Sequence, residues 1–122
     1  MSSNANLTEY LSEIESVISE QEKKVVLGNS LNYLQTLPEF KLIIGDGYLK
    51  YALDNAVTTI TNTLDPKSQE VREALDKIAS VNRLKEYFEG IMSDAIYAPG
   101  RIEQEQDFRR EYTAENSEVI DE

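Results

Sequence analysis

Apolar residues recur at helical spacing from about residue 7 to residue 37. The stripe consists of Leu7, Leu11, Ile14, Ile18 and Val25. This spacing gives an amphipathic helix with one apolar side that needs a partner. Asn6 is expected to be its N-cap, and Glu9 would complete a capping box. Gly28 weakens helix propensity by about 1 kcal/mol, so either one long helix or two consecutive helices fit this zone.

A second pattern begins at Pro38, which suits the first turn of a helix because no backbone amide hydrogen is needed there. The densest apolar run of the chain follows it. We expect a short helix that ends at Gly45-Asp46-Gly47, where a glycine in the left-handed conformation would close the last turn. Structural turns are therefore predicted at Pro38, Gly45 and Gly47.

A further helix is predicted from about Tyr48 to Leu64. The β-branched residues between Val57 and Thr61 are also compatible with a strand. Helix is preferred, because the chain offers no second strand candidate with which these residues could pair.

The longest regular pattern follows Asp65-Pro66, which is predicted to be an N-cap with proline at the first helical position. Its apolar positions are Val71, Leu75, Ile78, Val81, Leu84, Phe88, Ile91 and Ala95. Pro66 is thus a further predicted structural turn. The pattern stops at Ala98-Pro99-Gly100, so the helix is expected to end there.

Few large apolar residues follow Pro99, and residues 99–122 hold eight acidic and three basic residues, a net charge of −5. We expect a marginal helix over 101–113 and a disordered acidic end. The predicted fold class is all-α, an elongated helical hairpin or small helical bundle in residues 1–98. A flexible, partly disordered acidic C-terminal tail in residues 99–122 would follow.

The amino-acid composition limits which kinds of chemical site and which partners this chain can have. A chain of 122 residues fits one modest core, and it contains neither cysteine nor histidine. Disulfides, thiolate chemistry, the usual zinc sites and the commonest general base are therefore excluded. The net charge of −11 and the absence of a basic stripe argue against direct nucleic-acid binding and against anionic membranes. Basic protein partners are favoured instead.

Isolated carboxylates have simpler explanations than catalysis. Asp46 between two glycines could be a catalytic or metal-binding group, but turn chemistry explains it better. Glu103, Glu105 and Asp107 alternate as weak calcium ligands could, yet they lack the spacing of a calcium-binding loop, so a solvated charge run is preferred. We assign no catalytic, cofactor-binding or metal-binding residue, and we expect no cofactor and no enzymatic activity.

Aromatic residues suggest a protein interface. Tyrosine combines apolar area with a polar tip and suits surfaces that are buried only part of the time. The candidate interface consists of Phe40, Ile44, Tyr48, Tyr51, Tyr87, Phe88 and Tyr97. The apolar stripes exceed what one short chain can cover, so we expect self-association into a homo-oligomer or a partner helix.

A family resemblance is carried by Pro38-Glu39-Phe40-Lys41-Leu42-Ile43-Ile44 and Gly47-Tyr48, by the Asp65-Pro66 turn, and by Leu84-Lys85-Glu86-Tyr87-Phe88. In this combination the chain resembles a group of small acidic helical proteins encoded by tailed bacteriophages. The resemblance covers roughly residues 31–98. It implies a phage origin and a place among proteins of virion assembly, and it implies nothing about the N-terminal helix or the tail.

Two functions follow as hypotheses. The first is a non-enzymatic structural or assembly protein that binds capsid, portal or other virion proteins through its amphipathic helices. The alternative is an acidic inhibitor that mimics DNA and occupies a basic groove on a host nucleic-acid enzyme. Acids concentrated near the C-terminus favour assembly, because a mimic needs them spread over the folded body. No signal peptide or membrane span is expected, so we expect the protein in the host-cell cytoplasm and, if it joins the particle, in the virion.

Overall fold

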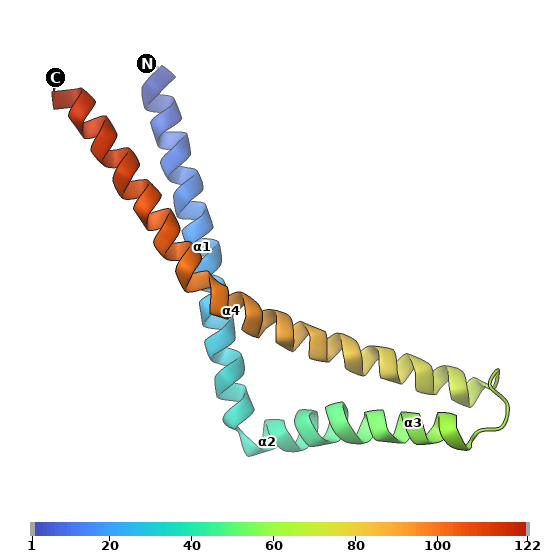
Figure 1. The fold of residues 1–122 in the computed structure, drawn as a ribbon. Coiled ribbons are helices and arrows are strands. Elements are labelled where there is room, and N and C mark those ends of the chain that lie inside the picture. Colours follow the sequence, from blue (N-terminus) through green and yellow to red (C-terminus); the bar gives the residue numbers. More distant parts are fainter. Residues whose placement is uncertain (1, 122) are drawn as a thin grey trace. The chain divides into compact units, whose positions relative to one another are not determined.

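The fold is all-α, as predicted. The computed structural model describes the backbone of residues 2–121 and the side chains of residues 6–116. Its elements are α1 (Ser2–Thr36), α2 (Pro38–Phe40), the π-helical segment η1 (Lys41–Ala52), α3 (Leu53–Asn62) and α4 (Gln69–Asp121) (Figure 1). The described backbone contains no strand, so the helical interpretation of residues 57–61 is confirmed.

Contacts divide the chain into two compact units. Unit 1 combines Met1–Asn29 with Ser93–Glu122, and unit 2 is the continuous stretch Ser30–Met92. Helix α4 contributes to both units. Each unit pairs helical segments in an antiparallel manner (Figure 1).

Unit 2 begins where α1 ends at a proline. Leu37 has extended dihedral angles, φ −77° and ψ 128°, because the ring of a following proline disfavours helical geometry at the residue before it. Pro38 is the first residue of α2, and the amide of Lys41 donates to the carbonyl oxygen of Leu37 at 3.1 Å. The segment 38–62 then runs alongside the first half of α4, green beside yellow in Figure 1.

The core of unit 2 is thin, because two helical layers cover each other on one side only. Its buried apolar residues are Leu31, Ala56, Val71, Ala74, Val81 and Ile91. Of the regular pattern of residues 71–95, Val71, Val81 and Ile91 are buried, with Val81 at an exposed fraction of 0%, whereas Leu75 is 53% exposed, so the pattern places the buried side of α4 only in part. Most other large apolar side chains of the unit remain half-buried or exposed.

The helix end predicted at Gly45-Asp46-Gly47 is wrong. All three residues lie inside η1, and no residue among those described has a positive φ. In a π-helix, amides bond to carbonyls five residues back, which usually happens only in single turns. A Cβ placed on Gly47 would lie 2.9 Å from the carbonyl oxygen of Leu42, five residues back, whereas Gly45 has nothing within 4 Å. Glycine at 47 therefore accommodates the wide turn instead of ending it.

The connection between α3 and α4 also differs from the prediction. Asp65 and Pro66 form a turn before the helix, in which the amide of Lys67 donates to Asp65 Oδ1 at 2.9 Å. The N-cap is Ser68, whose Oγ accepts from the amide of Val71 at 3.2 Å. The Asp65-Pro66 cap prediction is thus wrong by three residues, although Pro66 does lie in a turn.

Threonine hydroxyls in α3, and that of Thr63 just after it, donate hydrogen bonds to backbone carbonyls of the same segment. Thr59 donates to the carbonyl of Asn55 at 2.9 Å, Thr61 to Val57 at 2.9 Å, and Thr63 to Thr59 at 2.6 Å. Each bond reaches four residues back, the pattern by which threonine fits into a helix. This explains how a β-branched run adopts helical structure here.

Unit 1 pairs the N-terminal part of α1 with the C-terminal part of α4, blue beside orange and red in Figure 1. The rings of Tyr10 and Tyr112 lie 4.3 Å apart between centroids. Ile14, Ile18 and Ala98 are buried. α1 starts at Ser2 and runs unbroken past Gly28, so Asn6 is not its N-cap and one long helix occupies this zone.

The predicted helix end at Ala98-Pro99-Gly100 is wrong. α4 continues through Pro99 to Asp121, although proline lacks an amide hydrogen and leaves the carbonyl four residues earlier without its usual donor. Packing against α1 offsets that cost, because Ala98 is fully buried and Tyr112 meets Tyr10. Residues 101–116 are thus a packed helix where a marginal helix and the start of a disordered tail were expected. Residue 122 lies outside the described residues.

Candidate interaction surfaces

Aromatic side chains join the two layers of unit 2. The rings of Phe40 and Phe88 lie 6.0 Å apart, and those of Tyr87 and Phe88 lie 6.1 Å apart. Farther along the same pairing, Lys77 Nζ lies 5.9 Å from the centre of the Tyr48 ring, within reach of a cation–π interaction. The sides of Phe40 and Tyr48 that face Phe88 and Lys77 of α4 therefore stabilise the hairpin itself.

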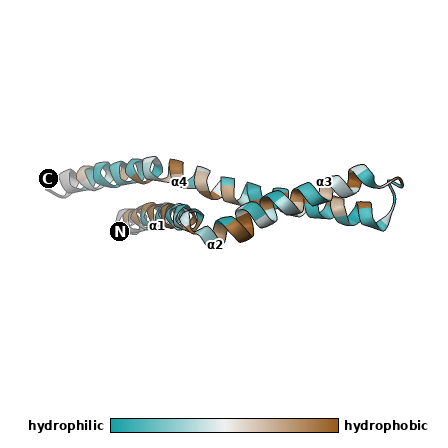
Figure 2. Ribbon diagram, turned by 90° about the horizontal axis from the view of Figure 1, so that it is seen from below, coloured by the Kyte–Doolittle hydropathy of each residue, from teal (hydrophilic) through white to brown (hydrophobic). Residues whose placement is uncertain are grey.

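The opposite side of η1 is apolar as well. Leu42, Ile43 and Tyr51 have exposed fractions of 69%, 65% and 59%, and together we call them the η1 surface. In a π-helix each turn is wider than in an α-helix, so residues spaced by four, five or nine positions lie on the same side. Leu42 and Tyr51 are nine positions apart and therefore share a side. Figure 2 shows hydrophobic colour concentrated where η1 follows α2. Exposed apolar residues that gather on one side of a helix are typical of a protein-interaction site, so this surface is suited to a partner.

The structure divides the seven predicted interface residues. Tyr51, Tyr87 and Tyr97 are exposed, at 59%, 59% and 75%. The other four are half-buried within the hairpin: Phe40, Ile44, Tyr48 and Phe88. All seven except Tyr97 belong to unit 2.

Sequence reasoning missed Leu42 and Ile43, although a signal was present. Three consecutive aliphatic residues, 42–44, cannot all face one partner in a helix. At least one of them had to point away from α4, and the prediction selected only Ile44, which is half-buried.

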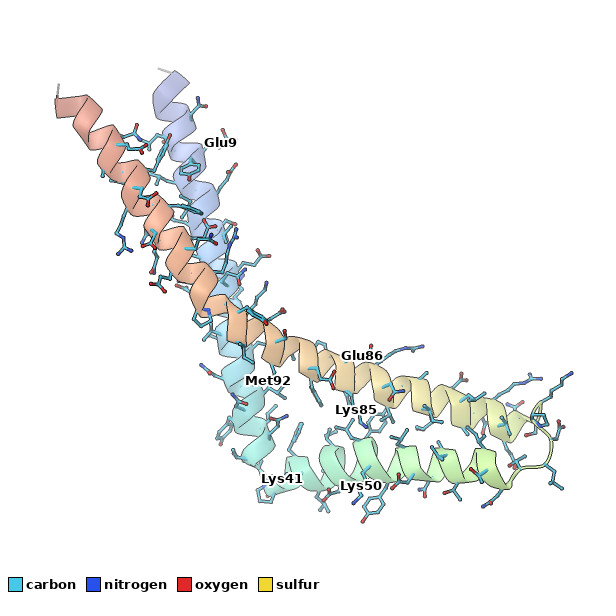
Figure 3. All side chains as sticks on the ribbon, in the orientation of Figure 1. Glu9, Lys41, Lys50, Lys85, Glu86 and Met92 are labelled. Atoms are coloured by element: carbon cyan, nitrogen blue, oxygen red, sulfur yellow. The ribbon has the colours of Figure 1, made fainter. Side chains whose placement is uncertain are left out.

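Charged residues of both signs flank the η1 surface. Lys41, Asp46 and Lys50 are all exposed on the same segment, and Figure 3 labels the two lysines. Unit 2 as a whole contains nine acidic and seven basic residues, a net charge of −2. The surroundings of the η1 surface are therefore nearly neutral, and its apolar character decides what it binds.

Unit 1, by contrast, is strongly acidic. It brings together acids from both ends of the chain, fourteen against five basic residues, for a net charge of −9. In sequence these charges are separated by all of unit 2. Because fields add over distances comparable to a Debye length of about 8 Å, their proximity in the fold makes unit 1 far more attractive to cations than either segment alone.

A recess of about 280 Å³ lies between the two helices of unit 1. Its lining residues are Tyr10, Glu13, Ile14, Val17, Arg101, Glu105 and Phe108. Arg101 Nη2 lies 2.9 Å from Glu105 Oε1, and Glu105 is only 5% exposed. The interpretation of residues 103–107 as a solvated charge run is therefore wrong for Glu105, which turns inward because its segment packs on α1.

A larger open recess of about 520 Å³ lies in unit 2 between α3 and the start of α4. It is lined by Ala52, Asn55, Ala56, Thr59, Glu70, Glu73, Ala74 and Lys77. Three of these are alanines, whose small side chains leave space between the helices. Gln69 Nε2 donates to Glu73 Oε1 at 3.2 Å at its edge.

Among the described residues, no three His, Cys, Asp or Glu side chains gather so that they could hold a metal ion. No described helix is both long and apolar enough to cross a membrane. Comparisons with protein-family models, with curated proteins and with solved structures found no match. The chain's own surfaces and its sequence pattern are therefore the basis of the functional proposal.

Proposed function

We propose that this is a non-enzymatic protein-interaction protein that takes part in the assembly of a tailed-phage particle. The observation that carries the proposal is the η1 surface, where Leu42, Ile43 and Tyr51 stay exposed on a segment whose other side already packs on α4. The partners would be capsid, portal or other virion proteins, and a second copy of this chain. The protein would act in the host-cell cytoplasm and could remain in the virion.

The magnitude of burial supports a binding role. Fully burying an aliphatic side chain contributes about 1.5–3 kcal/mol. At exposed fractions of 69% and 65%, covering Leu42 and Ile43 would contribute roughly 2–4 kcal/mol together. Association itself costs at least about 4 kcal/mol, so the η1 surface would be the centre of a wider interface.

The phage setting rests on the resemblance in residues 31–98. That range nearly coincides with unit 2, Ser30–Met92, and it includes the whole η1 surface. A resemblance that lies mostly in the unit carrying the exposed apolar residues is what a shared binding role would produce. Self-association follows from the same surface, because two copies can cover each other's apolar residues.

The phage proposal is tested by proteomics of purified mature particles beside empty precursor particles. A scaffold would be found in precursors only, and a virion component in both. Absence from both would refute the assembly role.

The η1 surface is tested by sedimentation velocity on the full chain and on a variant with Leu42→Ser and Ile43→Ser. The matched control is Leu64→Ser, since Leu64 is 101% exposed in the loop before α4 and packs on nothing. We expect wild type and control to self-associate at micromolar concentration and the double variant to stay monomeric. Equal behaviour of all three proteins would refute the role of this surface.

A second candidate, inhibition of a host nucleic-acid enzyme by DNA mimicry, is favoured by the charge of −9 gathered in unit 1. The fold spreads these acids over two neighbouring helices, which the linear sequence did not indicate. A mimic would compete with duplex DNA for a basic DNA-binding enzyme, and competition would weaken steeply with salt. Lack of competition at low salt would exclude this candidate.

A further inference from the structure

The recess in unit 1 combines groups that recognise organic cations. Tyr10 and Phe108 contribute aromatic rings from opposite helices, with exposed fractions of 36% and 39%. Glu13 and Glu105 contribute carboxylates, and Ile14 and Val17 contribute aliphatic surface. Aromatic faces attract cations through their quadrupole, most strongly where water is partly excluded.

The electrostatics of the recess leave a charge uncompensated. Arg101 is bound to Glu105 and is itself 49% exposed in its side chain. Glu13 has no ion-pair partner among the described residues. The two carboxylates and one guanidinium give the lining a net charge of −1, and the surrounding unit carries −9. A positive group would therefore be drawn toward unit 1 and held in the recess.

Size limits what can enter. The volume of about 280 Å³ lies below the roughly 300–1,000 Å³ of pockets that bind drug-sized ligands. One extended side chain suits such a space better than a folded small molecule. Arginine fits best, because its planar guanidinium stacks on aromatic rings and bonds carboxylates with two donors. Its aliphatic stem can lie against apolar residues such as Ile14 and Val17.

We propose that the recess receives an arginine side chain from a basic segment of a protein partner. This extends the proposed function and rests on it only for the source of the arginine, because the site lies in unit 1, apart from the residues of the η1 surface. A bound arginine would give unit 1 a specific contact with the partner, whereas attraction between charges alone is not specific.

The probe is a blocked arginine, N-acetyl-arginine methylamide, and the matched control ligand is blocked citrulline, which has nearly the same shape and no charge. Each is titrated into the ¹⁵N-labelled full chain while amide shifts are followed by NMR. We expect the arginine probe to shift amides around Tyr10, Glu13 and Phe108, and citrulline to bind at least roughly fivefold more weakly. Equal binding of the two ligands, or no shift at the recess, would overturn the proposal.

Variants separate a specific site from a general acidic surface. Glu13→Gln removes the unpaired carboxylate at an exposed position, so the fold should survive. Glu20→Gln is the control, since it removes the same charge from the same helix outside the recess. We expect Glu13→Gln to weaken arginine binding at least roughly fivefold and Glu20→Gln to change it less than about twofold. Equal weakening by both would reduce the recess to non-specific attraction.

A last variant distinguishes this inference from the proposed function. The protein with Leu42→Ser and Ile43→Ser should lose self-association and keep its arginine binding. If the probe fails on wild type while self-association persists, the recess proposal alone is wrong. If self-association and particle association fail while the probe binds, the proposed function alone is wrong.

Discussion

Substituting the two glycines of η1 by alanine should have opposite effects. Both have negative φ, and alanine in a helix is favoured over glycine by about 0.5–1 kcal/mol. At Gly45 nothing lies within 4 Å of the added Cβ, so Gly45→Ala should stabilise the protein by about that amount. At Gly47 the Cβ would lie 2.9 Å from the carbonyl oxygen of Leu42, a contact that the backbone must shift to relieve.

The net effect at Gly47 follows from two opposing contributions. Forcing an extra carbon into occupied space typically costs about 1–3 kcal/mol, which exceeds the propensity gain. Gly47→Ala should therefore destabilise by roughly 1 kcal/mol, and the two variants should differ by roughly 2 kcal/mol. In a chain of this size that gap corresponds to about 6–10 °C in Tm. The reason differs from the left-handed turn that the sequence suggested, because no positive φ is involved.

The measurement is thermal unfolding of both variants and wild type, followed by circular dichroism at 222 nm, with urea unfolding as a second estimate. Gly45→Ala serves as the matched control, because it lies two residues away in the same segment. If Gly47→Ala stabilises the protein as much as Gly45→Ala does, the close approach of the Leu42 carbonyl is absent and the π-helical explanation is wrong.

Three further predictions concern stability. Ser68→Ala removes the N-cap of α4 and should cost about 1 kcal/mol; an unchanged urea midpoint would mean that Ser68 does not cap the helix. Val81→Ala removes part of a fully buried side chain and should lower the free energy of unfolding by about 2 kcal/mol, and a loss under 0.5 kcal/mol (roughly the effect of a surface substitution) would contradict its burial. Deleting residues 101–122 removes the partner of Tyr10 and should lower Tm by several degrees, whereas an unchanged Tm would restore the interpretation of this segment as an independent tail.

Helical periodicity predicted the fold class well, because apolar spacing is set by each segment's own need to bury one side. The pattern from Val71 to Ile91 contains Val81, which is fully buried. Pro38 was expected to start a helix and does so, since its missing amide hydrogen is a local property. Predictions from apolar spacing and from proline therefore succeed where neighbouring residues alone determine the secondary structure.

Predictions from glycine and proline failed where distant packing decided. Gly45 and Gly47 were expected to end a helix, yet the helical path continues because residues on either side pack on α4. Pro99 was expected to stop α4, and contacts with α1 carry the helix past it. Tyr10 and Tyr112 are about a hundred residues apart in the sequence, and Phe40 and Phe88 about fifty, so no local window reveals these contacts.

The same difference between local sequence information and long-range packing applies to the candidate sites. Tyr51 and Tyr87 were predicted as interface residues and are exposed, but Leu42 and Ile43 were omitted, although three consecutive aliphatic residues cannot all face one partner helix. The recess around Glu105 could not be predicted, because its walls come from opposite ends of the chain. The acidic character of unit 1 was likewise hidden by counting charge along the sequence.

The construction of unit 1 from both ends of the chain has a consequence for the order of synthesis and folding. Unit 2 consists of one continuous stretch, Ser30–Met92, so its contacts can form as soon as those residues leave the ribosome. The α1 part of unit 1, Met1–Asn29, is translated before unit 2, yet its partner, Ser93–Glu122, is translated after unit 2. Domains generally fold as units during synthesis, and contacts of high sequence separation form slowly. Ile14 and Ile18 therefore have no covering surface while unit 2 is being made, and in that interval the nascent chain is the form of this protein most dependent on a chaperone or an early partner.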